Sequence, residues 1–421
     1  MNICLLCYRG NPYSGGQGGY LYSLSRELAR MGHRVTILVG PPLPRPMPWA
    51  KIVPVESLNL WGVRRGFLPP ATPWAIFRPL NFYEWAVTRF GFFPEMLIFS
   101  IRMIPIMKEM FRFEKFDVIH DVQSLGYGLL LARRFGRPVV TTVHHPLTID
   151  YAASLERDRN FKEHYYTVVF YPLKMQRRVI RRLDRVITSS EETAREISRS
   201  FRVRPERIRN VYNGLDAEFL QPANGTPRAP KGLLFVGNTD DTKKGIVYLL
   251  KAMTLLPDDV TLTVVDQGRP AKTYAPGLVE GWGLAKRVLF TGKIPTGSLR
   301  ELYAKSAVAI LPSLYEGFGL PAAEAMACET PVVATNVGAL PEVVGGGGAG
   351  RLVPPRDPEA LAAAIRELLE DPKQRAEMGR KGRQRVSELF TWEKVAERTV
   401  NVYRELLESR SAEREAQSGD H

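Results

Sequence analysis

The sequence predicts an α/β protein made of two Rossmann-like domains, whose parallel sheets face each other across a cleft. Three observations lead to this fold class. The chain has 421 residues, whereas a single domain usually has about 100 to 200. It opens with a strand, turn, helix and strand that are typical of a βαβ unit, and a second series of apolar strands follows a segment rich in Pro, Gly and Asn.

The first domain is expected to begin with this βαβ unit. Its expected elements are a strand at residues 2–8, a glycine turn at 14–19, a helix at 20–31 and a strand at 34–39. Gly32 lies just past the helix, where a left-handed C-cap is favoured. Later strands are expected at 118–120, 139–143 and 186–189. Helical stretches flank each of them, so the sheet should be parallel.

The second domain is expected to repeat this architecture. Residues 221–232 are interpreted as the linker, which divides the chain into domains at 1–220 and 221–392. Strands are expected at 233–236, 261–265, 288–291, 307–311, 331–335 and 351–353. A C-terminal helix at about 393–408 is expected to pack back on the first domain. Residues 409–421 are expected to be disordered because Ser, Arg, Glu and Gly replace apolar residues there.

Charge is distributed unevenly along the chain. The net charge is +14, and residues 1–225 hold 32 Lys and Arg against 19 Asp and Glu, whereas the remainder holds 26 against 25. The first domain is therefore expected to meet an anionic partner such as lipid headgroups, a phosphorylated acceptor or nucleic acid. Nucleic acid is disfavoured because the arginines lack a recognisable recognition fold.

Three cysteines, Cys4, Cys7 and Cys328, do not form a disulfide framework. Cys4 and Cys7 have the spacing of half a metal site, but they lie in an apolar segment that is interpreted as a buried strand. The apolar stretch at residues 1–7 is too short for a secretory signal. A reducing cytoplasm fits best, with peripheral attachment to the inner face of the membrane as an alternative.

Residues 41–113 do not show the regular strand and helix pattern of the rest of the first domain. They hold ten prolines between Pro41 and Pro79 and thirteen aromatic residues from Trp61 onward, so this stretch is expected to be irregular. A membrane span is not expected, because Glu95, Arg102 and Pro105 interrupt its most apolar section. A short interfacial helix remains open as an alternative.

The strongest chemical motif is Ser-Leu-Tyr-Glu-Gly-Phe-Gly-Leu-Pro-Ala-Ala-Glu at residues 313–324, directly after an expected strand. Glu316 should lie on the turn, Pro321 at the start of a helix and Glu324 one turn into it. Gly317 and Gly319 allow backbone amides to approach an anion at the helix N-terminus. Two carboxylates beside a phosphate-binding turn are expected to accept hydrogen bonds from hydroxyls of a sugar nucleotide.

This motif resembles that of the family 4 glycosyltransferases. The resemblance covers nearly the whole chain and implies the GT-B fold and sugar transfer with retention of anomeric configuration. It assigns Glu316 to the hydroxyls of the donor sugar and Glu324 to the nucleotide ribose. It also implies donor contacts from the turn at Gly317, Phe318, Gly319 and Leu320.

The glycine turn of the first domain fits the same resemblance. In the family it brings backbone amides to the donor phosphate, which implies contacts from Gly15 and Gly16. Dinucleotide binding is a weaker alternative, because no Asp or Glu follows the second strand, which ends in Val39-Gly40-Pro41.

A histidine follows the buried strand at residues 139–143, at the sheet edge where ligands bind in doubly wound folds. The family places a histidine here beside the donor sugar, so His144 is assigned this role, with His145 as the alternative. The Asn213-Gly214-Leu215-Asp216 segment resembles the family's domain junction and is expected to shape the site.

The segment at residues 237–245, which the resemblance assigns to binding of the donor phosphates, departs from the family pattern. Relatives commonly carry an Arg after the glycine that ends the first strand of the second domain, where this chain has Asn238. Lys244 keeps its place before the next glycine. An amide lacks the charge-assisted, bidentate hydrogen bonds of a guanidinium, so either Lys243 compensates or the donor is held more weakly.

The expected reaction is retaining transfer of a hexosyl group from a nucleotide sugar, with Lys244 and the turn amides stabilising the departing phosphate. No cofactor is expected, and no metal, because no Asp or His cluster has ligand spacing. Arg177, Arg178, Arg181 and Arg182 repeat at helical spacing beside apolar residues 165–173. That stripe suits an anionic membrane surface or a lipid-linked acceptor in cell-envelope polysaccharide or glycolipid synthesis.

Two classes of alternative function stay open at this level. One is a catalytically weak or non-catalytic nucleotide-sugar-binding protein, which Asn238 favours. The other is an epimerase or phosphorylase of the same fold. A phosphorylase would need a cofactor lysine setting that is not recognisable in the sequence, and an epimerase would not need the long insertion at residues 41–113.

Overall fold

The structure is a computed structural model that describes residues 1–11, 16–58, 60, 73–215, 218–220, 228–266 and 274–418. The chain forms two compact units. The first unit holds residues 1–189, 193–211 and 396–421, and the second holds 190–192 and 212–395. The main division therefore falls between residues 211 and 212, whereas the sequence predicted it after residue 220.

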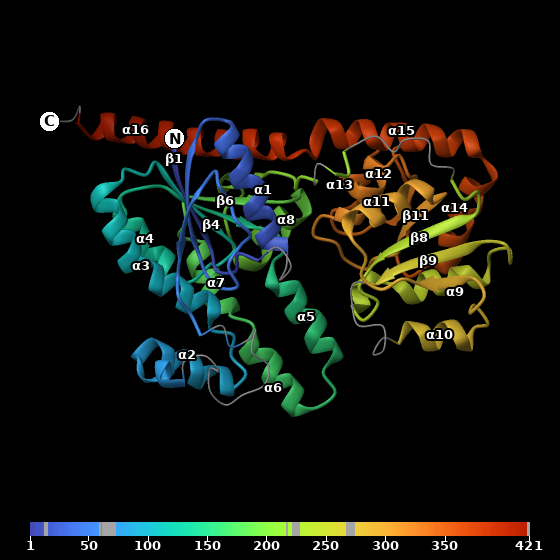
Figure 1. The fold of residues 1–421 in the computed structure, drawn as a ribbon, viewed down its shortest axis with the longest axis horizontal. Coiled ribbons are helices and arrows are strands. Elements are labelled where there is room, and N and C mark those ends of the chain that lie inside the picture. The colour runs from blue at the N-terminus through green and yellow to red at the C-terminus, as the bar shows by residue number, and fades with distance from the viewer. Residues whose placement is uncertain are drawn as a thin grey trace. The chain divides into compact units, whose positions relative to one another are not determined.

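The first unit is built on a seven-stranded parallel sheet with the order β3-β2-β1-β4-β5-β6-β7 (Figure 1). The strands are β1 Asn2–Cys7, β2 Arg34–Val39, β3 Lys51–Pro54, β4 Val118–Val122, β5 Val139–Val143, β6 Arg185–Thr188 and β7 Ile208–Asn210. The order reverses between β1 and β4. Side chains that follow these two strands and their neighbours therefore lie at a topological switch point, where ligands bind in such sheets.

Helices cover the sheet of the first unit. They are α1 Gly16–Arg30, α2 Pro79–Arg89, α3 Glu95–Phe113, α4 Gly128–Ala132, α5 Leu147–Arg157, α6 Phe161–Phe170, α7 Leu173–Ile180, α8 Glu191–Phe201 and α16 Trp392–Ser418, with the 3-10 turns η1 Pro73–Phe77, η2 Arg133–Phe135 and η3 Pro205–Arg207. Gly32 follows α1 with a φ of 81°, which confirms the predicted left-handed cap. Cys4 and Cys7 are fully buried in β1, and burial raises the pKa of each thiol to about 12, which confirms their structural interpretation.

The second unit repeats the architecture with a six-stranded parallel sheet of order β10-β9-β8-β11-β12-β13. Its elements are β8 Gly232–Gly237, η4 Thr242–Lys244, α9 Ile246–Thr254, β9 Thr261–Asp266, α10 Ala275–Gly281, β10 Val288–Phe290, α11 Thr296–Lys305, β11 Val308–Leu311, α12 Leu320–Ala327, β12 Val332–Thr335, α13 Leu340–Val344, β13 Arg351–Val353, α14 Pro358–Glu370 and α15 Pro372–Leu389. All six predicted strands are present. The strands β8, β11 and β12 are buried along almost their whole length because helices cover both faces of the sheet, whereas the edge strand β10 exposes Leu289.

The sequence predicted an irregular stretch at residues 41–113, but this stretch contains regular secondary structure. It contains β3, η1, α2 and the 19-residue helix α3. Met96, Phe99, Met103 and Met107 of α3 are buried in the core of the first unit. Pro105 lies inside this helix on its exposed side and does not end it. The apolar stretch is thus mainly a core helix, because its buried side chains recur every three or four residues.

The C-terminal segment also differs from the expectation of a disordered tail. Helix α16 continues to Ser418. Arg410 fastens it to the first unit by hydrogen bonds to the Gly136 carbonyl at 3.2 Å and the Asp184 carboxylate at 3.1 Å. These contacts hold the part of α16 around Arg410 against the first unit. Across the described residues, no helix combines the length and apolar character needed to cross a bilayer.

Candidate active site

The second unit places Lys244 beside Glu316, two residues that are 72 positions apart in the sequence. Lys244 Nζ lies 2.6 Å from Glu316 Oε1, and the Ser313 hydroxyl donates to the same oxygen at 3.0 Å. The Glu316 side chain is 9% exposed and that of Lys244 is 25% exposed. The ion pair is therefore partly shielded from water, which strengthens it relative to a surface pair.

Local backbone geometry explains why these two residues meet. Gly245 follows Lys244 with a φ of 65°, and a Cβ at that position would lie 1.9 Å from the Pro312 carbonyl oxygen. Only glycine permits this approach, which brings the end of η4 against the segment that follows β11. Leu314 N–H also donates to the Lys243 carbonyl at 2.7 Å.

The predicted turn and helix after β11 are both present. Gly319 has a φ of 94°, and α12 begins at Leu320 with Pro321 in its first turn. Gly317 lies in the turn before Gly319, so the main-chain amides of this turn lead directly into the helix N-terminus. The Phe318 ring packs in the core against Phe390, with ring centroids 5.3 Å apart. Phe318 can therefore meet a ligand only through its main chain.

Glu324 lies on α12, where its Oε2 accepts a hydrogen bond from the Tyr303 hydroxyl at 3.0 Å. Tyr303 is 1% exposed, and burial together with the Glu324 carboxylate raises the pKa of its hydroxyl well above the ordinary value. Tyr303 thus stays a neutral donor that orients Glu324. The sequence analysis missed Tyr303, because nothing local links α11 to α12.

Asn238, the departure from the family pattern, closes a turn. Its side-chain Oδ1 accepts a hydrogen bond from the backbone of Asp240 at 2.9 Å, and its side chain is exposed. Lys243 approaches Asp241 Oδ2 at 3.8 Å. Asn238 directly follows β8, and Lys243 lies in η4 beside Lys244.

The first unit holds His144 directly after β5. Its ring lies edge-on against the Tyr20 ring of α1, with centroids 4.4 Å apart. The imidazole Nε2 of its neighbour His145 lies 3.0 Å from Asp150 Oδ2 on α5. His144 therefore faces α1, at the edge of the sheet where the glycine turn lies, whereas the side chain of His145 is held against α5.

Gln123 holds the backbone of both histidines. Its Oε1 accepts from His144 N–H at 2.8 Å, and its Nε2 donates to the His145 carbonyl at 2.7 Å. Gln123 is 5% exposed and has a φ of 54°, a left-handed conformation that is costly for this residue type. A strained residue at the end of β4 thus positions the candidate histidine.

A buried polar network supports this strained turn. The Asp121 carboxylate accepts hydrogen bonds from Ser124 N–H, Leu125 N–H and the Thr141 hydroxyl. Burial raises the pKa of Asp121 to about 6, an effect that these hydrogen bonds oppose. The sequence alone does not reveal this network, because it depends on pairing between β4 and β5.

A second network joins the same region to the C-terminal helix. His120 Nδ1 lies 2.5 Å from the Tyr403 hydroxyl of α16, and His120 Nε2 lies 2.7 Å from Thr142 Oγ1. The Tyr20 hydroxyl lies 3.3 Å from the same Thr142 oxygen. Burial lowers the pKa of His120 to about 3, so its imidazole is neutral at pH 7.

The glycine turn differs from its predicted form. Gly16 begins α1, so the helix starts four residues earlier than expected, and Gly15 lies outside the described residues. A Cβ on Gly18 would lie 2.5 Å from the Asn11 carbonyl oxygen, which explains the need for glycine at this position. Gly16 remains exposed at the helix N-terminus.

Of the junction segment, Asn213 to Leu215 are described and Asp216 is not. Gly214 packs against Trp392, where a Cβ would lie 2.7 Å from the indole ring. Leu215 is 2% exposed and its N–H donates to the Phe390 carbonyl. Among the described residues, no group of three or more His, Cys, Asp or Glu side chains has the arrangement of a metal site.

Replacing Gln123 by Gly is expected to lower kcat/KM by roughly 10- to 100-fold, because the loop that presents His144 loses its clamp. The same change relieves the left-handed backbone strain but removes the hydrogen bonds to His144 N–H and the His145 carbonyl, so the free energy of unfolding should fall by on the order of 1 to 3 kcal/mol. Steady-state kinetics and chemical denaturation of one preparation separate the two effects. Full activity in Gln123→Gly would contradict the positioning role.

Comparison with known proteins identifies the family. A relative from Mycolicibacterium hassiacum, MMP alpha-(1->4)-mannosyltransferase, is 37% identical over 411 residues, which cover 97% of this chain and 98% of the relative. The chain belongs to glycosyltransferase family 4. The family model described as Glycosyltransferase Family 4 matches residues 14–219, and that described as Glycosyl transferases group 1 matches residues 216–385.

Solved structures share the fold of this chain. Sucrose-phosphate synthase from Thermosynechococcus elongatus is 26% identical with a TM-score of 0.74, over 97% of this chain and 100% of that one. Anabaena Alr3699/HepE in complex with UDP-glucose is 18% identical with a TM-score of 0.64, over 97% and 100%. This glycosyltransferase therefore has the predicted GT-B fold and transfers a sugar from a nucleotide-sugar donor.

Proposed function

We propose that this glycosyltransferase moves a hexosyl group with retention of anomeric configuration, without a metal ion, to a hydroxyl of a lipid-linked acceptor at an anionic membrane surface. The Lys244–Glu316 ion pair is the observation that carries the donor side of this proposal. It places an ammonium and a carboxylate 2.6 Å apart beside the turn that starts α12. Such a pair can bind a phosphate oxygen and a sugar hydroxyl at neighbouring points of one donor.

The proposed mechanism assigns each group a separate task. Lys244 and the main-chain amides of residues 317–320 stabilise the negative charge that develops on the departing diphosphate. Glu316 accepts hydrogen bonds from the donor sugar, and Glu324, oriented by Tyr303, accepts them from the ribose. His144 lies beside the sugar, and the acceptor hydroxyl attacks from the face that the diphosphate leaves. No side chain is assigned as a covalent nucleophile.

Positive charge from lysines and a helix N-terminus supports the metal-independent part of the proposal. Lys243 and Lys244 are adjacent, and the α12 N-terminus carries a partial positive charge. Together these groups perform the electrostatic task that a divalent cation performs in other nucleotide-sugar enzymes.

A screen of nucleotide sugars tests the reaction. The M. hassiacum relative is named a mannosyltransferase and the HepE structure holds UDP-glucose, so mannosyl and glucosyl donors come first. We expect one donor to stabilise the protein thermally, an α-linked donor to give an α-linked product by NMR, and EDTA to leave the rate unchanged. An inverted product would contradict retention, and activity restored by Mg²⁺ after EDTA would contradict metal independence.

An exposed aromatic surface on the first unit supports the membrane part of the proposal. Its residues are each between 41% and 86% exposed: Trp74, Phe77, Phe82, Tyr83, Phe90, Phe92, Phe161, Tyr165 and Tyr166. They belong to η1, α2, α6 and the segment after α2, and Gly91 lies directly against the Tyr166 ring. In Figure 1, α2 and α6 both lie on the side of the first unit away from α16. Exposed aromatic residues gathered in this way are typical of membrane or partner contacts.

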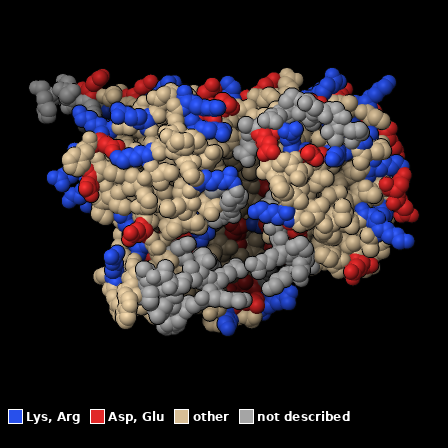
Figure 2. Space-filling view, viewed as in Figure 1, with Lys and Arg blue, Asp and Glu red and all other residues tan. Residues whose placement is uncertain are grey.

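The predicted arginine stripe is only partly helical: Arg177 and Arg178 lie on α7, which ends at Ile180, and Arg181 and Arg182 lie in the turn after it. Arg178, Arg181 and Arg182 are exposed and Arg177 is half-buried, while Val179 of the same segment packs in the core. In Figure 2, lysines and arginines are spread over the surface rather than gathered into one patch. The stripe therefore adds exposed positive charge to the first unit, and the exposed rings supply the apolar contact.

The protein is expected to sediment with liposomes that contain phosphatidylglycerol at low salt. Phe77→Ala combined with Phe161→Ala should weaken this binding by at least about tenfold, because two exposed rings lose their apolar contact. Arg178, Arg181 and Arg182 changed together to Gln should instead reduce the dependence on anionic lipid, by roughly 1 kcal/mol per charge. Leu289→Ala, at a 62% exposed position of the second unit, is the matched control. Absence of sedimentation at low salt would exclude membrane attachment.

A further inference from the structure

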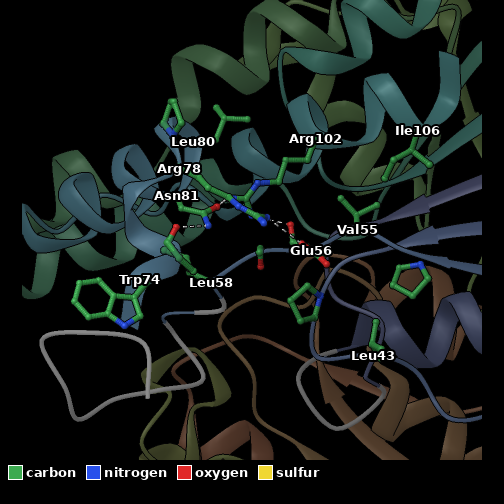
Figure 3. A pocket seen from close by; sticks show the side chains of 15 residues that line it. Leu43, Val55, Glu56, Leu58, Trp74, Arg78, Leu80, Asn81, Arg102 and Ile106 are labelled. Carbon is green, nitrogen blue, oxygen red and sulfur yellow. Dashed lines mark hydrogen bonds and ion pairs between the residues drawn. The ribbon is translucent and has the colours of Figure 1, made fainter. Parts of the chain in front are cut away.

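A cavity of about 1440 Å³ lies in the first unit, between the segment after β3, η1, α2 and α3. Figure 3 shows its lining side chains around a common space. Its apolar wall is formed by Leu43, Val55, Leu58, Trp74, Leu80 and Ile106. Small-molecule sites usually have volumes of about 300 to 1,000 Å³, so this cavity has room for a ligand larger than one sugar ring.

Two of the polar side chains of the cavity, Arg102 and Asn81, are held by contacts within the protein. Arg102 Nη1 donates to the Glu56 carbonyl at 2.7 Å, and its Nη2 contacts Asn81 Oδ1 and lies 2.9 Å from Glu84 Oε2. Figure 3 shows Arg102, Asn81, Arg78 and Glu56 directed toward one another. Arg78 Nη1 lies 3.8 Å from the Glu56 carboxylate. Arg102 and Asn81 are thus used within the protein, whereas the Arg78 and Glu56 side chains are 77% and 90% exposed to solvent. Apolar residues form most of the remaining cavity surface.

The cavity connects two regions that the proposed reaction uses. At one end, its lining residues Pro41 and Leu43 follow β2, and Gly10 N–H donates to the Gly40 and Pro42 carbonyls at 3.3 and 3.0 Å. Gly10 belongs to the segment that leads from β1 to the N-terminus of α1. At the other end, Trp74 is 80% exposed and is part of the exposed aromatic surface. The cavity thus extends from the ligand-binding edge of the sheet to the surface proposed to meet lipid.

We infer that this cavity binds the apolar part of an amphipathic acceptor, an alkyl or aryl glycoside, whose hydroxyl-bearing head lies at the sheet edge. The inference rests on the proposed function and names its acceptor class. An apolar chain fits the observations better than further sugar units do. A glycan subsite would need polar side chains along its length for the sugar hydroxyls, whereas Arg102 and Asn81 already bind each other and apolar residues form most of the wall.

Binding of octyl glucoside, below its micelle concentration, tests the inference by calorimetry without any nucleotide sugar. Methyl glucoside and maltotetraose serve as the short-chain and glycan probes. Each buried methylene contributes roughly fourfold to affinity, so octyl glucoside should bind at least about 100-fold more tightly than methyl glucoside. Leu43→Glu and Leu80→Glu should each weaken octyl glucoside binding by at least about tenfold. These positions are 50% and 38% exposed, so the fold should tolerate the change.

Leu131→Glu is the matched control, because Leu131 is 41% exposed in the same unit but does not line the cavity. It should bind octyl glucoside as the wild type does, and circular dichroism should show all three variants folded. Equal binding by Leu43→Glu, Leu80→Glu and Leu131→Glu would overturn the inference, as would tighter binding of maltotetraose than of octyl glucoside. Because no donor is present, failure here leaves the proposed transfer reaction standing, and failure of the donor screen leaves this measurement valid.

Discussion

Replacing Lys244 by Ala is expected to lower kcat/KM for sugar transfer by about 100- to 1000-fold, the usual effect of removing one group that stabilises developing charge. Lys244 Nζ lies 2.6 Å from Glu316 Oε1. Without the ammonium, the turn that should receive diphosphate loses its neighbouring positive charge, and the 9% exposed Glu316 side chain loses its partner. The variant therefore loses attraction for the leaving group.

Steady-state kinetics with the donor found in the screen would measure this effect, with thermal unfolding as the check on folding. Lys251→Ala, at an exposed position of α9, is the matched control and should be fully active. Glu324→Ala should also abolish transfer while leaving the fold intact, because the ribose loses its acceptor and Tyr303 its partner. Full activity in both Lys244→Ala and Glu324→Ala would refute the assignment of this site.

His120 and Asp121, neighbours on β4, are expected to give the first unit opposite dependences of stability on pH. His120 has a pKa lowered from 6.5 to about 3. Its neutral form is favoured in the folded state, so its contribution is present above pH 6.5 and is lost as the pH falls toward 3, on the order of 5 kcal/mol in total. Asp121 has a pKa raised from 3.8 to about 6. Its contribution is present below pH 3.8 and is lost as the pH rises through 6, on the order of 3 kcal/mol.

Between about pH 4 and 6 the two effects should largely cancel in the wild type. In Asp121→Asn only the pH dependence due to His120 should remain, so that the free energy of unfolding falls by about 1.4 kcal/mol for each pH unit between 6 and 4. In His120→Gln only the pH dependence due to Asp121 should remain, so that the free energy of unfolding rises as the pH falls through the same range. Amide hydrogen exchange of β4 and β5, corrected for intrinsic rates, would report the first unit alone. His164→Gln, at an exposed position of α6, should follow the wild type, and identical slopes in all variants would contradict the coupling.

Local sequence patterns were informative where one segment determines its own structure. The turn at residues 313–319 and the start of α12 could be predicted, because a glycine with positive φ and a proline in the first helical turn are local requirements. Helix α3 was not predicted, because the prolines and aromatic residues of residues 41–113 indicated an irregular stretch, although Phe99, Met103 and Met107 have helical spacing. Its proline lies on the exposed side, so the buried side chains still form one continuous face.

The support around His144 could not be predicted. Gln123 is 21 residues from His144, and nothing in its own segment distinguishes it from any polar residue after a strand. Tyr403 is 283 residues from His120, so their contact requires α16 to return to the first unit. Tyr303 and Glu324 are likewise brought together by the packing of α11 on α12.

By itself, the sequence determined the two parallel-sheet units, the turn between Glu316 and Glu324, and the position of His144 at a strand end. These features depend on the period of apolar residues and on glycine and proline at particular steps, which act over a few neighbouring residues. Only the tertiary structure decided which side chains meet: Lys244 with Glu316, Gln123 with the backbone of His144, and Trp74 with the cavity beside α3. Those contacts depend on strand order and helix packing, which bring together residues that no local pattern connects.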